Sequence, residues 1–199
     1  MKKIILSAAI MLASAGAYAQ HAVGSINLQP KVGMNIATLT DYEDAKSRIG
    51  LATGLELEYQ ASDIFSLSIG GIYSMQGVKK EKTIGKKEYS TTIKLDYINV
   101  PIMANVYVAN GLAVKLGVQP GFKVNSEITP KSTERKIIRK ATMDPEIESF
   151  DLSIPVGISY EFSNLQIDAR YNWGLTKVFK NRDYKNSVFQ ITLGYKFDL

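Results

Sequence analysis

The chain of 199 residues contains no cysteine and only one histidine. The absence of cysteine excludes disulfides, thiolate metal sites, cysteine nucleophiles and a lipid-modified N-terminal cysteine, but it excludes no cellular compartment. A catalytic triad or a His-Asp dyad needs a positioned imidazole. His21 lies close to the start of the chain, so we expect it to belong to a solvated tail. The usual chemistries of membrane proteases and acyltransferases are therefore not expected.

Other marks of an enzyme are also missing. The sequence has no glycine-rich loop that could hold a phosphate and no cluster with metal-ligand spacing. Asp41, Glu43 and Asp44 could suggest calcium, but three acids in a loop are usually a solvated surface. We therefore expect no catalytic residue, no metal site and no cofactor, and the chain is interpreted as a non-enzyme.

Beyond residue 20 there is no stretch of about 18 apolar residues, so no transmembrane helix is expected. The first 19 residues have a composition of their own. A pair of lysines is followed by a short apolar run and by the A-x-A cleavage pattern Ala17-Tyr18-Ala19. The run is too short for a membrane anchor. We expect residues 1–19 to be a cleaved secretory signal peptide and residues 20–199 to form one domain.

Helical periodicity is nearly absent, and alternation of apolar with other residues is nearly everywhere. In the C-terminal half, one phase of this alternation carries no charge: Leu112, Val114, Leu116, Val118, Pro120, Phe122, Val124, Phe150, Leu152, Ile154, Val156, Ile158, Tyr160, Phe162, Leu165, Ile167, Ala169, Tyr171, Trp173, Leu175, Phe189, Ile191, Leu193, Tyr195, Phe197 and Leu199. The opposite phase holds the charged residues and several glycines. The alternation predicts long β-strands.

Eight such segments can be drawn, at about 24–39, 49–61, 64–78, 90–108, 112–125, 149–162, 165–178 and 187–199. Tight turns join some of them, at Ser62-Asp63, Ala109-Asn110-Gly111 and Ser163-Asn164, and long polar connections join the others, at 40–48, 79–89, 126–148 and 179–186. Short turns on one side and long loops on the other are typical of a membrane barrel. The predicted fold class is all-β: an eight-stranded antiparallel up-and-down transmembrane β-barrel with short periplasmic turns and long extracellular loops.

Alternation alone does not say which phase points inward. A soluble lipocalin-like barrel would place the apolar phase around a ligand, whereas a membrane barrel places it against lipid. The polar phase is rich in glycine, serine and asparagine, which fit the crowded interior of an eight-stranded barrel. It also holds charges of both signs, and buried charges need partners. We expect an interior charge network of Lys31, Glu56, Glu58, Lys115, Glu161, Asp168, Arg170 and Lys196, with Lys123, Asp151 and Asp198 on the same phase.

Aromatic residues gather near both ends of the predicted strands, as in the interfacial girdles of membrane barrels. One band is Tyr59, Phe65, Tyr107, Tyr160, Phe162 and Phe197, and the other is Tyr73, Tyr97, Phe122, Phe150, Tyr171, Trp173 and Phe189. The alternation also slips between Tyr97 and Ile98. We predict a β-bulge beside Pro101, because proline removes a ladder donor and a bulge shifts the phase.

The last eight residues carry a pattern of their own. Thr192-x-Gly194-x-x-Phe197-x-Leu199 resembles the C-terminal β-signal of outer-membrane barrels. The resemblance implies that Gly194, Phe197 and Leu199 are recognised by the barrel-assembly machinery. One departure is Leu199, because that signal commonly ends in an aromatic residue.

Two internal stretches carry a second resemblance. "DYINVPIMANVY" (96–107) resembles the Tyr-x-x-x-Pro strand motif of PorT-like outer-membrane β-barrel proteins, and "ISYEFSNLQIDARYNWGLTKV" (158–178) resembles their following hairpin. The resemblance covers nearly all of residues 20–199. It implies a barrel in the outer membrane of a Gram-negative bacterium and little about activity. One branch of the family is associated with secretion and gliding, and no motif here transfers that role.

The stretch 79–89 is rich in lysine, with Lys79, Lys80, Lys82, Lys86 and Lys87. An exported protein does not meet nucleic acid, so the anion that suits these lysines is the phosphate of lipopolysaccharide. A solubilising loop explains them equally well. The longer connection 126–148 has Arg135, Lys136, Arg139 and Lys140 around two isoleucines, and it either extends the strands or folds over the barrel mouth.

These observations favour a monomeric outer-membrane barrel with a structural or interaction role at the cell surface. Its expected partners are outer-membrane lipid, lipopolysaccharide, the assembly machinery and an unknown surface or periplasmic protein. A narrow transport pore is the second interpretation, and a soluble periplasmic barrel that binds an apolar ligand is the third. An unusual enzyme is a distant fourth.

Overall fold

The structure is a computed structural model, and it describes residues 21–40, 45–84, 87–132 and 147–199. Several sequence-based expectations lie outside the described residues: the signal peptide at 1–19, the acids Asp41, Glu43 and Asp44, Lys86 of the lysine-rich stretch, and the basic residues of 135–140. Among the described residues no helix is long and apolar enough to cross a membrane.

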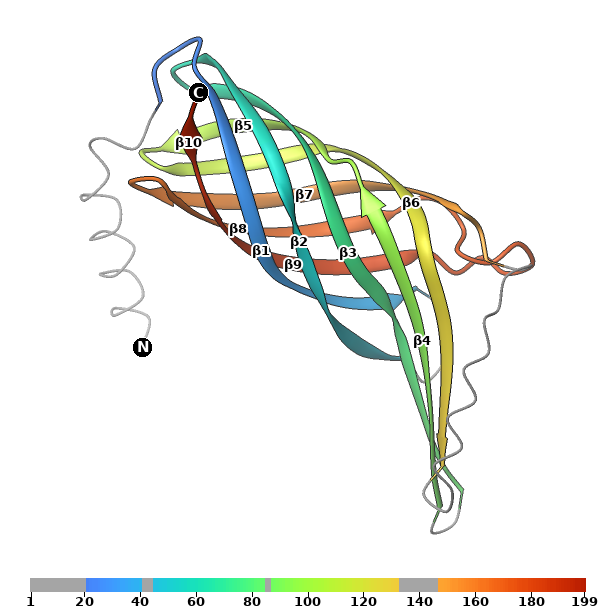
Figure 1. The fold of residues 1–199 in the computed structure, drawn as a ribbon. Coiled ribbons are helices and arrows are strands. Elements are labelled where there is room, and N and C mark those ends of the chain that lie inside the picture. The colour runs from blue at the N-terminus through green and yellow to red at the C-terminus, as the bar shows by residue number, and fades with distance from the viewer. Residues whose placement is uncertain (1–20, 41–44, 85–86, 133–146) are drawn as a thin grey trace.

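The described chain is built of antiparallel strands that close into a barrel (Figure 1). Their bounds are β1 Ile26–Leu39, β2 Ala45–Ser62, β3 Phe65–Ile84, β4 Lys87–Asn99, β5 Ile102–Ala109, β6 Leu112–Ser132, β7 Phe150–Phe162, β8 Leu165–Gly174, β9 Asn186–Tyr195 and β10 Phe197–Asp198. β4 and β5 share one place in the ring between β3 and β6, and β9 and β10 share the place beside β1. The ring therefore has eight strand positions, and the predicted fold class is confirmed.

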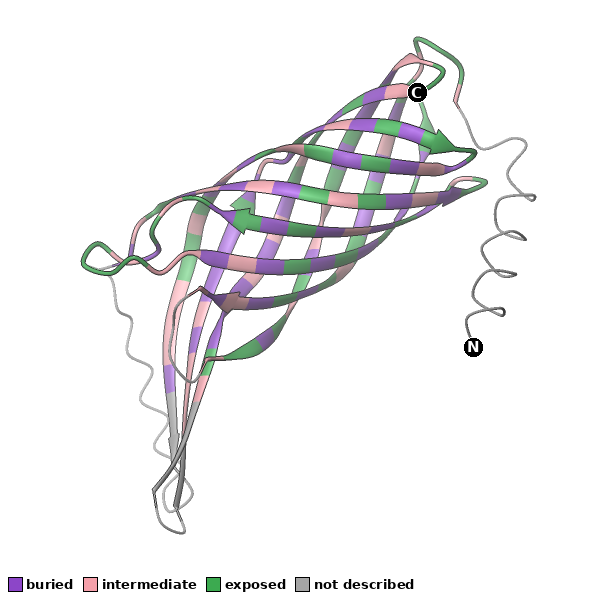
Figure 2. Ribbon diagram, turned by 180° about the vertical axis from the view of Figure 1, so that it is seen from behind, coloured by how far each residue is buried: buried purple, intermediate pink, exposed green. Residues whose placement is uncertain are grey.

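Buried and exposed residues alternate along most strands (Figure 2), as expected when successive side chains point into and out of the barrel. The apolar phase faces outward: Leu116 is 55% exposed, Ile158 55% and Trp173 61%. The polar phase is buried inside. An apolar surface that surrounds a polar interior is the arrangement of a barrel in lipid. It contradicts the alternative of a soluble barrel with an apolar lumen.

Three two-residue turns join the strands at one end of the barrel, which we call the short-turn end. Gly111 has φ of 73° and Ser163 has φ of 54°, the left-handed conformation that tight hairpins require. The C-terminus lies at the same end, where the backbone N–H of Leu199 donates to the carbonyl of Ile26 at 3.0 Å. The last residues are thus part of the wall and do not form a tail.

The opposite end, which we call the long-loop end, differs from the prediction. Residues 79–89 were predicted as a polar loop, but β3 continues to Ile84 and β4 begins at Lys87. β6 likewise runs to Ser132 and pairs with β4 as far as Tyr89. The result is a three-stranded extension that stands well beyond the other strands (Figure 1). The sequence did not reveal this hairpin, because most residues of 79–89 are polar and a regular alternation with apolar residues is lost there.

The region of Pro101 both agrees with and corrects the prediction. The ladder opens at Val100–Pro101, between β4 and β5, as expected of a proline. The alternation does not change phase there, because Tyr97 is buried and Ile98 is 44% exposed, like Ile102 at 45%. The register shift lies instead on β6, where one extra residue stands between the partners of Asp96 and Tyr97. The apparent slip arose because the inward residues change from apolar to polar along this strand.

The two aromatic bands are also only partly as expected. Most of their members face outward, including Phe122 and Phe162. Tyr97 and Tyr107 instead point into the barrel, with exposures of 1% and 6%. An aromatic side chain near a strand end can pack against lipid or inside the barrel. Its position in the sequence therefore did not tell the inward aromatic residues from the outward ones.

Candidate functional site

The barrel interior holds a balanced set of charged side chains. β1, β2, β6, β7, β8 and the β9–β10 junction contribute them, and all are at most 3% exposed: Lys31, Glu56, Glu58, Lys115, Glu161, Asp168, Arg170 and Lys196. They are four cations and four anions. Their spacing along each strand places them on the inward phase. Isolated charges would be very costly to bury, so the arrangement of the pairs decides whether the interior is stable.

The central part of the network has two carboxylates shared among three cations. The Nζ of Lys31 lies 2.9 Å from Oε1 of Glu56, and the Nζ of Lys115 lies 3.2 Å from the same oxygen. Asp168 receives Lys115 at 2.9 Å and the Nε of Arg170 at 2.7 Å. Arg170 also reaches Glu56, at 3.4 Å. Each carboxylate therefore bridges strands that are not neighbours in the sheet, across the lumen.

A second part of the network lies nearer the short-turn end. Lys196 Nζ is 2.7 Å from Oε2 of Glu161 and 3.1 Å from Oε2 of Glu58. The other oxygen of Glu58 accepts hydrogen bonds from the Tyr107 hydroxyl at 2.6 Å and from the Ser66 hydroxyl at 2.7 Å. Here hydroxyl donors supply what a second cation supplies in the central part. The inward turn of Tyr107 thus has a chemical reason.

His21 does not lie in a solvated tail, and that expectation is wrong. Its side chain is 11% exposed, with Nε2 2.9 Å from Oε1 of Glu161 and Nδ1 2.7 Å from Oδ1 of Asp198. The hydrogen bond to Glu161 raises the pKa of His21 above its ordinary value of 6.5. The imidazole therefore covers the network at the short-turn end. The sequence offered one indication of this contact, because Glu161 and Asp198 both lie on the inward phase near the short-turn end and could receive an imidazole.

Of the three other charged residues on this phase, Lys123 and Asp151 stand apart from the network. Lys123 donates to the carbonyl of Ile147 at 2.9 Å, and Asp151 accepts from the hydroxyl of Thr176 at 2.7 Å. Both lie toward the long-loop end. Asp198 meets the network through His21, and its side chain is 64% exposed. The part of the chain that the structure describes contains no group of three or more His, Cys, Asp or Glu side chains that could hold a metal ion.

Glycines on the inward phase make room for the larger side chains. A Cβ on Gly157 would lie 2.7 Å from the Cβ of Arg170, which is its partner across the β7–β8 ladder. A Cβ on Gly194 would lie 2.7 Å from Nε2 of Gln29. Both distances are shorter than the van der Waals contact of a carbon atom allows. The glycines thus permit an eight-stranded barrel to hold long inward side chains.

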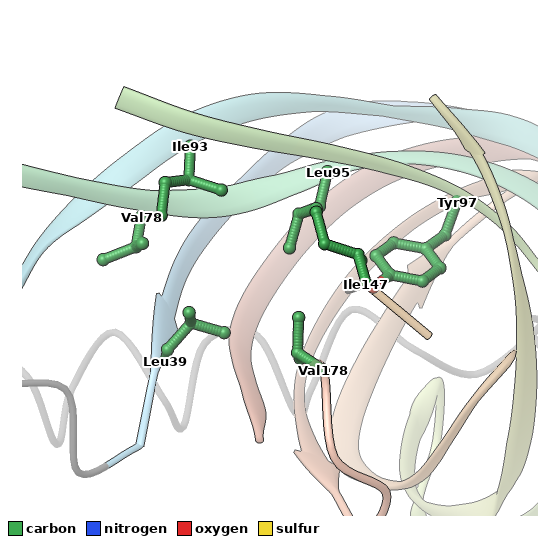
Figure 3. Close-up of a cluster of buried hydrophobic side chains, with 7 residues drawn as sticks. All are labelled: Leu39, Val78, Ile93, Leu95, Tyr97, Ile147 and Val178. Carbon is green, nitrogen blue, oxygen red and sulfur yellow. The ribbon is translucent and has the colours of Figure 1, made fainter. Parts of the chain in front are cut away.

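The long-loop end is filled by an apolar cluster, shown in Figure 3. Its members come from β1, β3, β4 and two segments beyond the strands: Leu39, Val78, Ile93, Leu95, Tyr97, Ile147 and Val178. Ile147 and Val178 are 4% and 2% exposed. The backbone N–H of Glu148 donates to the carbonyl of Val178 at 2.9 Å, which joins the two segments. The cluster therefore covers one end of the lumen, as His21 covers the other.

The C-terminal residues of the β-signal pattern are placed in the closing seam of the barrel. Gly194 pairs with Lys31 of β1, and Phe197 pairs with Leu28. The rings of Phe197 and Tyr195 lie 4.7 Å apart on the outer surface. Leu199 is 77% exposed. The pattern thus lies at the end of the chain, where β9 and β10 pair with β1 and close the barrel.

The lysine-rich stretch is divided between two strands. Lys79, Lys80 and Lys82 lie on β3, and Lys87 begins β4. Lys79 is exposed and Lys80 is half-buried, while the side chains of Lys82 and Lys87 lie outside the described part. The lysines therefore belong to the three-stranded extension and do not form a loop.

Comparison with known proteins agrees with this geometry. Neisserial surface protein A aligns with 14% identity and a TM-score of 0.54, over 86% of this chain and 97% of that one. Ail of Yersinia pestis aligns with 15% identity and a TM-score of 0.48, over 88% of this chain and all (100%) of that one. At 14% identity, the similarity to Neisserial surface protein A shows that the fold is shared and nothing more. No curated protein matches the sequence.

Residues 18–180 match the family described as the outer membrane protein β-barrel domain. The match spans most of the chain and includes β1 through β8. The protein is located in the outer membrane of a Gram-negative bacterium. The apolar outer wall, the polar lumen and the family match all indicate this location. The chain belongs to the outer membrane protein β-barrel domain family.

Proposed function

We propose that this protein is a non-enzymatic barrel with a closed interior, and that it acts through its outer surface in a structural or interaction role. The observation that carries the proposal is the interior itself. Four buried cations and four buried anions meet across the lumen, and Arg170 joins both Glu56 and Asp168. An eight-stranded barrel is only wide enough for its side chains, so a paired network fills the available section.

Both ends of the lumen support the same proposal. The apolar cluster with Ile147 and Val178 lies over the long-loop end, and His21 lies over the short-turn end. A solute would have to displace a buried apolar group, a set of ion pairs and an imidazole in turn. Separating buried ion pairs costs several kcal/mol for each ion left without a partner, about 3–5 kcal/mol per broken pair. This argues against the second interpretation, a narrow transport pore.

Planar bilayer recording tests the closed interior. Purified, refolded protein should show no large, stable conductance. The variant Val178→Asp is the informative companion, because it disturbs the apolar cluster and leaves the ion pairs in place. We expect this variant to stay closed as well. A porin-like conductance of the native protein would overturn the proposal and favour transport.

We also propose that the three-stranded extension is the part that meets a partner. It stands away from the membrane-spanning wall and presents lysines such as Lys79. Lipopolysaccharide phosphate or a surface protein suits this charge. Affinity capture from intact outer membranes tests it. The control protein would lack residues 79–92, because Val78 and Ile93 are ladder partners and a two-residue turn can join them. Equal recovery of partners with both proteins would contradict the proposal.

Two further parts of the proposal rest on sequence resemblance. The Tyr97-x-x-x-Pro101 motif, with the ladder opening that accompanies it, supports assignment to the PorT-like branch. The position of Phe197 in the seam supports recognition of the last strand by the barrel-assembly machinery. The apolar run and A-x-A pattern of residues 1–19 support export through a cleaved signal peptide.

A further inference from the structure

A cleft of about 540 Å³ opens on the outer surface at the long-loop end. Part of its lining is apolar, with Phe150 at the start of β7 and Leu175 just after β8. These side chains are 45% and 43% exposed and belong to the outward, lipid-facing phase. The rest of the lining is polar and comprises Thr176 and the charged residues Glu148, Lys177, Asp183 and Lys185. The cleft therefore crosses the boundary between the apolar wall and the polar end of the barrel.

The walls of this cleft are held in place by main-chain hydrogen bonds. The N–H of Leu175 donates to the carbonyl of Leu152 at 2.7 Å, and the N–H of Val178 donates to the carbonyl of Tyr184 at 2.8 Å. Thr40 and Lys185 are joined by the bond from Thr40 N–H to the Lys185 carbonyl, at 2.9 Å. Because Val178 is also anchored in the apolar cluster, the charged segments cannot drift away from the barrel wall.

The charged lining residues are two cations and two anions. Lys177 Nζ lies 3.5 Å from Oδ1 of Asp183, and both side chains are more than half exposed, at 57% and 68%. Such a pair is weakly held in water and is free to accept other partners. Lysine ammonium groups suit a phosphate, and carboxylates suit an ammonium group that can donate hydrogen bonds. The cleft thus offers complementary contacts to a headgroup that carries both charges.

We propose that this cleft binds a membrane lipid whose headgroup carries a phosphate and a primary ammonium group. The acyl chain lies against Phe150 and Leu175, the phosphate meets Lys177 and Lys185, and the ammonium group meets Glu148 and Asp183. Phosphatidylethanolamine and a lipopolysaccharide phosphate modified with ethanolamine share this chemistry. The inference rests on the outer-membrane location and does not depend on whether the lumen is closed.

The single tryptophan of the chain makes the test direct. Trp173 is 61% exposed and lies two residues before Leu175 on the same outward phase. Two residues along a strand span about 7 Å. A lipid with brominated acyl chains quenches tryptophan fluorescence on contact. The protein would be reconstituted in phosphatidylcholine, with brominated phosphatidylethanolamine or brominated phosphatidylcholine added at equal mole fractions.

We expect the relative association constant from Trp173 quenching to be about two- to fivefold higher for phosphatidylethanolamine. The double variant Lys177→Gln, Lys185→Gln should bring this ratio to about one. Lys180→Gln removes an exposed lysine of the same segment that does not line the cleft, and it should leave the ratio unchanged. The variant Lys177→Arg, Lys185→Arg should keep the preference, because it keeps the charge.

Equal quenching by the two lipids in the native protein would overturn the proposal, whatever the variants do. A loss of preference in Lys180→Gln as large as in the double variant would also overturn it, because the effect would then be general surface charge. Unlabelled lipid A with and without phosphoethanolamine separates the two lipid sources. Recovery of fluorescence with the modified lipid A supports a lipopolysaccharide ligand, and a retained preference without recovery supports the phospholipid.

Discussion

Gly157 and Arg170 stand directly opposite each other on β7 and β8, and the absence of a side chain on the first gives the second its place. A Cβ on Gly157 would also lie 2.5 Å from the carbonyl oxygen of Ala169. The wall and the charge network are therefore fitted to each other at this position.

We predict that Gly157→Ala lowers the free energy of unfolding by about 1–3 kcal/mol, because the methyl group overpacks the site and displaces Arg170. Urea unfolding followed by Trp173 fluorescence would measure it. Gly71→Ala is the matched control, since a Cβ there meets nothing within 4 Å. If both variants lose the same stability, the cost comes from glycine replacement in general and the fit to Arg170 is not its cause.

Removal of one carboxylate from the central network should be strongly destabilising. We predict that Glu56→Gln costs about 3–5 kcal/mol, because Lys31 and Lys115 both lose a partner while they remain buried. The exposed pair of Lys177 and Asp183 provides the comparison. Asp183→Asn should cost less than about 1 kcal/mol. Urea midpoints that differ little between the two variants would contradict a stabilising network.

The contacts of His21 predict a pH dependence. Glu161 and Asp198 both face the imidazole, and Lys196 lies on the far side of Glu161. The hydrogen bond to Glu161 is the largest influence on the pKa of His21, and together with the two negative charges it outweighs the lowering by burial and by Lys196. A raised pKa means that the folded state binds the proton more tightly than the unfolded state. The stabilisation is therefore fully present below about pH 6.5 and is lost as pH rises through the folded-state pKa.

We expect the stability difference between native protein and His21→Asn to be larger at pH 5.5 than at pH 9. Thermal unfolding monitored by gel mobility would measure it. Lys180→Gln is a suitable control because it changes charge far from both carboxylates at the short-turn end. A difference that stayed constant over this pH range would show that His21 contributes packing only.

Truncation of the C-terminal strand should prevent assembly. We predict that deletion of residues 197–199 leaves exported protein that lacks the heat-modifiable band of a folded barrel. The deletion removes the pairing of Phe197 with Leu28 and the bond from Leu199 to Ile26. Phe197→Tyr keeps an aromatic ring in the seam and should assemble normally. Folded barrel at native levels in the deletion protein would refute a role in assembly.

The barrel could be predicted from sequence because lipid imposes one simple requirement along the whole outer wall. Residues such as Leu116, Ile158 and Leu193 need only be apolar and outward, so the alternation is regular there. Inward positions obey no such uniform rule. Leu95 and Tyr97 point into the mouth as apolar residues, and on the same phase Asn99 is polar. The change from apolar to polar residues along one inward phase therefore resembled the shift in alternation that a β-bulge produces.

The members of the charge network could be read from the alternation, but their partners could not. Lys115 meets Glu56 and Asp168, which lie on strands that are not its ladder neighbours. Such contacts depend on strand stagger across the lumen, and local sequence does not encode stagger in a readable form. His21 was missed for the same reason, because its partners Glu161 and Asp198 are distant in sequence.

The length of the strands in the three-stranded extension has a mechanical consequence. β3 has 20 residues, whereas a membrane strand needs about 9–11. At about 3.3 Å per residue it measures roughly 66 Å, and a tilt of about 45° still leaves a height near 45 Å against a hydrocarbon layer of about 30 Å. A ribbon of three paired strands resists bending more than a single chain. The far end of β3 is thus held as a spacer of fixed height, and any molecule that contacts it does so at a set distance above the lipid.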